Sequence, residues 1–130
     1  MKRIGLIGGM SWESTADYYR YINEEVAARL GGLHSADIVL RSLDFAPVEQ
    51  MQRTGNWDAA GRLLAAAARD LEAAGAELVL LCTNTMHKMA GAITAATDVP
   101  FVHIAAVTAA SVRRSGVEKV GLLGTRFTME

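Results

Sequence analysis

Short apolar runs alternate with helix-like stretches along the whole of this 130-residue chain, and this alternation limits the folds open to it. The runs predict strands at residues 3–7, 38–43, 78–81, 101–104 and 120–123. Strands that are separated by helices pair in parallel, and the connecting helices then cover both faces of the sheet. We therefore expect an α/β fold with three layers, of the Rossmann-like or flavodoxin-like kind.

The stretches between the runs carry the spacing and end signals of helices. Apolar side chains recur every four residues after Ser14, which is expected to cap a helix that ends at Gly31. This helix would bury one face made of Tyr18, Ile22, Val26 and Leu30. Asn56 is expected to cap a long helix through Ala74, whose inner side would hold Leu63, Leu64, Ala67 and Leu71. Shorter helices are expected at 86–96 and from 105 to 115, whereas 46–54 is ambiguous, although Pro47 suits a first helical turn.

The composition of the chain excludes several classes of protein. Hydrophobic residues make up 51% of the chain and charged residues 21%, which excludes a disordered chain. The formal net charge is −1, so the sequence predicts no cationic surface for nucleic acid or an anionic membrane. No apolar run approaches the roughly 20 residues that span a bilayer, and the start of the chain is too short and glycine-interrupted for a signal peptide. These features predict a soluble cytoplasmic protein.

Three unusual segments follow predicted strands directly. They are Gly8-Gly9-Met10-Ser11, Cys82-Thr83-Asn84-Thr85 and Gly124-Thr125-Arg126. Because ligands of open α/β sheets bind at the carboxyl ends of the strands, these segments are the candidate site. The glycine segment matches neither a dinucleotide fingerprint nor a P-loop, so it predicts either a tight turn or a backbone that approaches a small ligand closely.

Cys82, the one cysteine of the chain, has two interpretations. Free cysteine is commonly a small buried hydrophobe. However, Cys82 follows an apolar strand and precedes a helix, where backbone N–H groups favour a thiolate and lower the pKa of the thiol below its usual value of about 8.5. Thr83, Asn84 and Thr85 would either cap the helix or hold a carboxylate, or do both.

The histidines and lysines limit the chemistry further. His87 would either polarise the thiol or be a polar residue of the first helical turn, and the two interpretations stay open. His34 is expected in a loop, and His103 as a core histidine of a short strand. One cysteine and one histidine cannot complete a zinc site, and no lysine context indicates a Schiff base.

Three motifs together resemble those of one enzyme family. Residues 4–15 read IGLIGGMSWEST, residues 80–87 read LLCTNTMH, and residues 124–129 read GTRFTM. In this order they resemble the aspartate/glutamate racemase family, and within it the bacterial broad-range amino-acid racemases. The resemblance implies two similar α/β lobes with the active site between them.

The resemblance also implies a mechanism without cofactor or metal. Each lobe supplies one cysteine; one thiolate removes the α-proton of an amino acid, and the opposite thiol returns a proton to the other face. The first of these roles falls on Cys82. Thr83, Asn84 and Thr85 would grip the substrate carboxylate or amine, and Met10 and Thr125 would line the cleft. Family members commonly dimerise, so a homodimer is expected.

Two departures from the family pattern matter. The second cysteine is absent, so residues 1–116 are expected to form the first lobe and 117–130 to begin a truncated second one. The chain alone is therefore predicted to be inactive, and no helix is expected after Thr128. Some family members that select aspartate place an arginine after the second strand. Here Gln52 is the candidate contact for the substrate side chain, unless the register is off by one and Arg53 takes that place.

Two other functions remain possible from the sequence. A related maleate isomerase or decarboxylase would use Cys82 as nucleophile or proton donor. A non-catalytic half-domain would only bind a small acid or assemble with partners.

Overall fold

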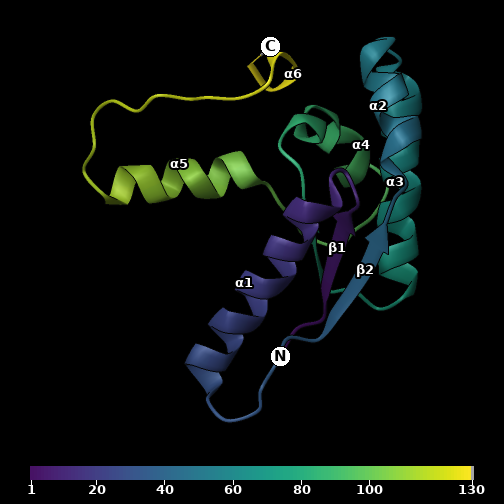
Figure 1. The fold of residues 1–130 in the computed structure, drawn as a ribbon. Coiled ribbons are helices and arrows are strands. Elements are labelled where there is room, and N and C mark those ends of the chain that lie inside the picture. Colours follow the sequence, from purple (N-terminus) through teal and green to yellow (C-terminus); the bar gives the residue numbers. More distant parts are fainter. Residues whose placement is uncertain (130) are drawn as a thin grey trace.

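The chain forms one parallel four-stranded sheet with helices on both of its faces (Figure 1). A computed structural model describes residues 1–129. The strands are β1 (Ile4–Gly8), β2 (Ile38–Ser42), β3 (Leu78–Leu81) and β4 (Phe101–Val102), and their order in the sheet is β2-β1-β3-β4. This order is that of flavodoxin-like folds, and it confirms the predicted α/β class.

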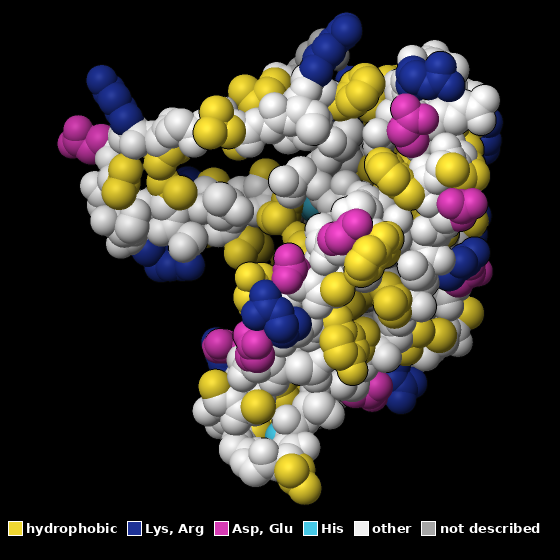
Figure 2. Space-filling view, viewed as in Figure 1, with side chains coloured by type: hydrophobic (Ala, Val, Ile, Leu, Met, Phe, Trp, Pro, Cys, Tyr) yellow, Lys and Arg dark blue, Asp and Glu magenta, His cyan; other side chains and the backbone are white. Residues whose placement is uncertain are grey.

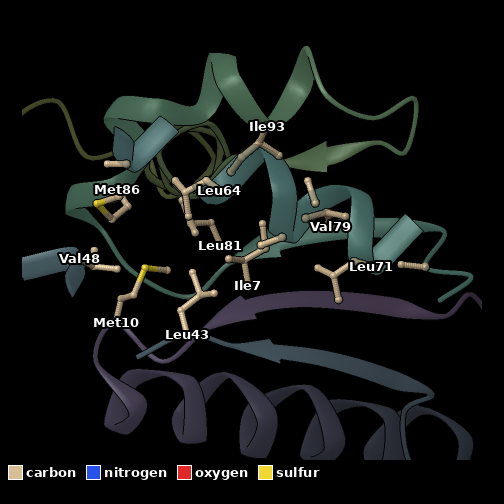
Figure 3. Packing of buried hydrophobic residues seen from close by; sticks show 14 residues of the cluster. Ile7, Met10, Leu43, Val48, Leu64, Leu71, Val79, Leu81, Met86 and Ile93 are labelled. Carbon is tan, nitrogen blue, oxygen red and sulfur yellow. The ribbon is translucent and has the colours of Figure 1, made fainter. Parts of the chain in front are cut away.

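The helices differ in length and in how closely they cover the sheet. They are α1 (Trp12–Leu30), α2 (Phe45–Arg53), α3 (Trp57–Ala73), the 3-10 helix η1 (Thr85–Met89), α4 (Ala90–Thr94), α5 (Ile104–Arg114) and α6 (Arg126–Met129). Helix α1 runs along one face of the sheet, and α3 and α4 lie on the other (Figure 3). The ambiguous region 46–54 is thus helical, with the Asp44 side chain accepting a hydrogen bond from the Ala46 N–H group.

The main hydrophobic core lies between the sheet and α3 (Figure 3). Ile7, Val79 and Leu81 project from the strands toward this side and pack with Leu64 and Leu71 of α3. Each fully buried aliphatic side chain stabilises the fold by about 1.5–3 kcal/mol relative to an exposed one. The predicted inner side of the long helix is confirmed, because these α3 residues are buried and Asn56 caps the helix through the Ala59 N–H group.

The opposite face of the sheet, along which α1 runs, is less completely buried. Tyr18, Ile22 and Val26 of α1 are half-buried, as their spacing predicts, but Leu30 is exposed. Ser14 does not cap this helix as expected. The helix begins earlier, with Ser11 at the N-cap position, and the Ser14 hydroxyl instead donates to the backbone carbonyl of Cys82 at 2.6 Å.

The prediction of a strand at 120–123 is wrong. Residues 117–125 are irregular, and Val120, Leu122 and Leu123 are exposed. The physical reason is that a strand needs a neighbour for its backbone hydrogen bonds, and this segment lies away from the sheet (Figure 1). A short helix, α6, nevertheless includes Thr128, where no helix was expected. The helix predicted at 86–96 is also interrupted, since η1 precedes the five-residue α4.

Candidate active site

Two of the three segments singled out in the sequence meet at the carboxyl edge of the sheet. Strand β1 pairs with β3 so that Ile7 lies opposite Leu81, which places the ends of the two strands side by side. The Cys82 N–H group extends this pairing and donates to the Ile7 carbonyl at 2.9 Å. The glycine segment after β1 and the cysteine segment after β3 are therefore direct neighbours.

The glycine segment is a tight turn against the protein's own chain. Gly9 has φ +89°, and a Cβ atom at this position would collide with the backbone of Leu43. The Leu43 N–H group donates to the Gly8 carbonyl at 2.9 Å, and the Gly9 N–H group donates to the Thr15 hydroxyl at 2.9 Å. The close approach that glycine permits here is thus used within the fold, which favours the interpretation as a tight turn.

The Cys82 thiol is buried, and its pKa is raised. The residue has no exposed surface, and burial raises the pKa of the thiol to about 12. The expectation of a reachable sulfur with a lowered pKa is therefore wrong for this structure. The reason is desolvation: the thiolate loses its hydration in the interior, and this cost outweighs any help from nearby N–H groups. Burial, and to a lesser extent the charge of the nearby Cys82 thiolate, raise the pKa of the Tyr18 phenol in α1.

The polar residues after Cys82 differ in their surroundings. Thr83 and Thr85 are half-buried, whereas Asn84 is exposed. Asn84 occupies the N-cap position of η1, but its side chain makes no capping hydrogen bond. The capping interpretation therefore fails for Asn84.

A row of three threonine hydroxyls links this segment to the end of the chain. Thr85 Oγ1 lies 2.9 Å from Thr128 Oγ1, which in turn lies 3.2 Å from Thr125 Oγ1. The structure thus brings the predicted residues Thr85 and Thr125 together through Thr128. Thr128 had no predicted part in the site; its signal was the spacing of three residues from Thr125, at the start of α6.

Gln52 and Met10 lie in a buried group beside the site. Gln52 is only 8% exposed, and its side-chain amide donates to the sulfur of Met86 at 3.1 Å. Met10 and Met86 are buried near Val48 of α2 (Figure 3). Arg53, the alternative to Gln52, is on the exposed side of α2 with its guanidinium 3.6 Å from Glu49. Of these two residues, Gln52 faces the interior and Arg53 faces solvent; which of them contacts a substrate stays a prediction.

His87 is bonded to backbone rather than to the thiol. Its Nδ1 lies 2.7 Å from the Thr83 carbonyl oxygen, and the Ile104 N–H group donates to its Nε2 at 3.3 Å. Burial lowers the pKa of His87; the hydrogen bond to the Thr83 carbonyl opposes this effect, and the nearby His103 adds to it. His103 is not a strand residue in the core as expected; it is the N-cap of α5 and accepts from the Ala105 N–H group at 3.2 Å. His34 lies in an exposed loop, as predicted.

Within residues 1–129, no three His, Cys, Asp or Glu side chains are grouped so that they would hold a metal ion. Over the same residues, none of the helices combines the length and the apolar character that crossing a membrane requires.

The structure is a parallel α/β lobe in which a buried cysteine, two threonines and an asparagine follow β3 beside the glycine turn after β1, at the edge of the sheet where open α/β folds bind ligands. The family assignment follows from a match to the family described as Asp/Glu/Hydantoin racemase, which covers residues 7–130. The chain belongs to this family.

Three solved structures are similar to the chain. A proposed Asp/Glu racemase from Yersinia pestis is 58% identical over 100% of this chain, with a TM-score of 0.95. An aspartate racemase homologue from Pyrococcus horikoshii is 35% identical over 99% of the chain, with a TM-score of 0.83. Picrophilus torridus aspartate racemase, at 22% identity over 99% of the chain and a TM-score of 0.81, shares the fold.

The chain spans only about half the length of these relatives. It covers 56% of the Yersinia protein, 56% of the Pyrococcus protein and 55% of the Picrophilus protein. The activity of a complete protein of this family is therefore treated below as a proposal.

Proposed function

We propose that this chain is the first lobe of a cofactor-independent amino-acid racemase in which Cys82 is one of two thiol groups that exchange the α-proton. One observation carries the proposal: in a chain of the Asp/Glu/Hydantoin racemase family, Cys82 lies at the carboxyl end of a central strand, next to the glycine turn that follows β1. Residues 1–116 would form this lobe, and 117–130 would begin the second.

The proposed reaction needs one group on each side of the substrate. A thiolate takes the α-proton, the electron pair left on carbon is delocalised into the carboxylate, and a thiol on the opposite side gives its proton to that carbon. The chain has one cysteine, so the opposite group would come from the second lobe. Hydrogen-bond donors aimed at the carboxylate would stabilise the charge that develops there.

The raised pKa suggests which role Cys82 takes first. With a pKa near 12 the thiol is protonated at neutral pH, so Cys82 would be the proton donor of the resting enzyme rather than the base that the family resemblance implied. In the reverse direction it must become a thiolate. A substrate ammonium group brought next to the sulfur is an opposite charge, and it would lower the pKa in the complex.

The neighbouring polar groups support a small substrate with a carboxylate. Thr83, Asn84 and Thr85 follow the reacting thiol, and Thr125 and Thr128 add hydroxyls beside Thr85. Met10 would line the cleft. The amide of Gln52 is neutral, so we expect weaker selection for an acidic side chain than an arginine would give. The family description also includes hydantoins, which have no free carboxylate and are the alternative substrate class.

The quaternary structure and location follow the family resemblance. We propose that the complete enzyme is a cytoplasmic homodimer, which needs neither pyridoxal phosphate nor a metal.

The test is exchange of the α-proton with solvent. The 130-residue chain is compared with a chimera in which it replaces the matching 56% of the Yersinia relative. Both are incubated with L-aspartate, L-glutamate and neutral amino acids in heavy water, and α-deuteration and the D-isomer are measured. We expect both products with the chimera and neither with the chain alone.

Variants identify the reacting group. Cys82→Ser in the chimera should lower the exchange rate at least about 1000-fold, since an alcohol is a far weaker acid and base at this position than a thiol. His34→Gln, in an exposed loop, should leave the rate unchanged. Steady formation of the D-isomer by the chain alone, or full activity of Cys82→Ser, would contradict the proposal.

A further inference from the structure

The backbone around Cys82 is held at three successive points. Cys82 donates its N–H to Ile7 at 2.9 Å, the Ser14 hydroxyl donates to the Cys82 carbonyl at 2.6 Å, and His87 Nδ1 bonds the Thr83 carbonyl at 2.7 Å. Two of these three bonds come from side chains. The position of the thiol therefore depends on Ser14 and His87 as well as on the sheet.

The two bonds of His87 require one particular form of its ring. A carbonyl oxygen only accepts, so Nδ1 must carry the hydrogen that bonds Thr83. The Ile104 N–H group only donates, so Nε2 must be free to accept it. Both bonds exist together only in the neutral ring protonated at Nδ1. A second proton, on Nε2, would remove the acceptor that Ile104 uses.

The surroundings of His87 oppose that second proton. The first turn of α5 directs the positive end of its dipole at the ring. The His103 ring, with its centroid 4.6 Å away, is the titratable group whose charge acts on His87, and the Phe101 ring lies on the β4 side at 5.8 Å. Lys88 follows His87 in the chain, but its ammonium group lies over the Trp57 ring.

We propose that neutral His87 is a positioning residue, which ties the backbone next to Cys82 to the first turn of α5 and releases it when the ring is protonated. The inference rests on the proposed function only in taking Cys82 as the reacting group. The consequence is that acid protonates His87 and thereby releases the backbone next to Cys82 from α5. The protonation state of the Cys82 thiol does not change in this step.

The experiment uses the single thiol as its own reporter. The rate of alkylation of Cys82 by iodoacetamide is measured in the folded 130-residue chain from about pH 5 to pH 8, the range over which histidine titrates. The rate for each variant is divided by the rate for the parent chain at the same pH, which cancels the ionisation of the thiol.

Two variants of His87 give opposite results. His87→Ala lacks the tie to α5 at every pH. At pH 8 its Cys82 should therefore be alkylated about threefold to tenfold faster than in the parent, which is the ratio that corresponds to the free energy of one hydrogen bond. This ratio should fall toward pH 5, because protonation of Nε2 removes the bond to Ile104 in the parent, while the Nδ1 bond to Thr83 remains. His87→Gln keeps a neutral donor and acceptor, so it should match the parent at pH 8 and react more slowly than the parent near pH 5.

Two controls separate this from a general loss of structure. His34→Gln, an exposed loop histidine, should match the parent throughout. His103→Asn keeps an N-cap side chain but removes the neighbouring charge, and the ratio of its rate to that of the parent should stay near one from pH 5 to pH 8.

The proposal is overturned if the ratio for His87→Ala is one at pH 8 or does not change with pH. It is also overturned if, near pH 5, the ratio for His103→Asn falls below one while the ratio for His87→Gln stays at one. Should His87→Ala fail to fold by circular dichroism, the His87→Gln comparison decides alone. Because labelling needs no turnover, failure of α-proton exchange in the chimera would remove the racemase proposal and leave this result standing.

Discussion

The most consequential residue of the site is Cys82, and its properties come from what surrounds it. Its backbone continues the pairing of β3 with β1, the Ser14 hydroxyl of α1 donates to its carbonyl, and its side chain is fully buried. Desolvation then decides its ionisation, because a thiolate without water or a counter-charge is costly in the interior. The position of Cys82 between a strand and a helix indicated a reactive thiolate, but in this structure burial keeps the side chain as a protonated thiol.

The raised pKa of Cys82 predicts a loss of stability at high pH. The unfolded chain gives up the thiol proton near the ordinary pKa of 9.0, whereas the folded chain keeps it up to a pKa of about 12. The stabilisation from the buried thiol is therefore complete below about pH 9 and is lost as the pH rises from there to about 12. The limiting slope for one proton is about 1.4 kcal/mol for each pH unit.

The measurement is urea unfolding at a series of pH values, with Cys82→Ala as the matched variant. The difference in free energy of unfolding between the two proteins isolates the thiol from the tyrosines and lysines that titrate in the same range. We expect this difference to shrink above pH 9. A difference that stays constant up to pH 11 would show that the thiol is exposed or ionises normally.

At the scale of elements, the turn between β1 and α1 joins the fold to the site. Gly9 adopts a positive φ and lies against the Leu43 backbone, while the Thr15 hydroxyl holds its N–H group. The start of α1 then supplies Ser14, whose hydroxyl reaches the Cys82 carbonyl. One turn therefore fixes β2, α1 and the segment after β3 relative to one another.

Gly9→Ala should destabilise the chain by about 3 kcal/mol or more, because strain at positive φ adds to a collision with backbone that cannot move aside. Gly55→Ala is the matched control: it also has positive φ, at +69°, but no atom lies within 4 Å of the added Cβ, so only about 1 kcal/mol is expected. Chemical denaturation measures both. Equal losses would mean that the contact with Leu43 contributes nothing.

At the scale of the whole molecule, the apolar surface is unevenly covered. Helix α5 has no buried residue, and it projects from the body together with the irregular segment 117–125 (Figures 1 and 2). Hydrophobic side chains are visible on this projecting part in Figure 2. The exposed large hydrophobic residues of α5 and of segment 117–125 are Val107, Val117, Val120, Leu122 and Leu123. Exposed apolar groups gathered in this way favour association.

We expect the 130-residue chain to associate with itself as its concentration rises, and we expect the double variant Leu122→Asp, Leu123→Asp to weaken this at least about tenfold. The reason is that each buried leucine contributes about 1.5–3 kcal/mol, whereas a buried aspartate opposes contact. Sedimentation equilibrium measures the association. Leu33→Asp, at a fully exposed leucine in the loop after α1, should have no effect. If it weakens association equally, the segment 117–125 is not the surface involved.

Much of the fold could be predicted from the sequence, because the signals were local. The run at 78–81 became β3 with the expected bounds, and Asn56 caps the long helix α3 as its position indicated. The sequence also placed the glycine and cysteine segments at one edge of the sheet, since the ends of parallel strands meet there. The strand at 120–123 failed because its apolar pattern says nothing about whether a pairing partner exists.

The amino-acid sequence by itself determined the α/β architecture, the family and the place of Cys82 at the end of a central strand, since each depends on short stretches of chain. Only the tertiary structure decided that the thiol is buried, that Gln52 rather than Arg53 faces inward, and that Ser14 and His87 hold the backbone around the cysteine. The physical reason is that desolvation and hydrogen-bond partners depend on residues distant in sequence: Ser14 and Cys82 are 68 positions apart.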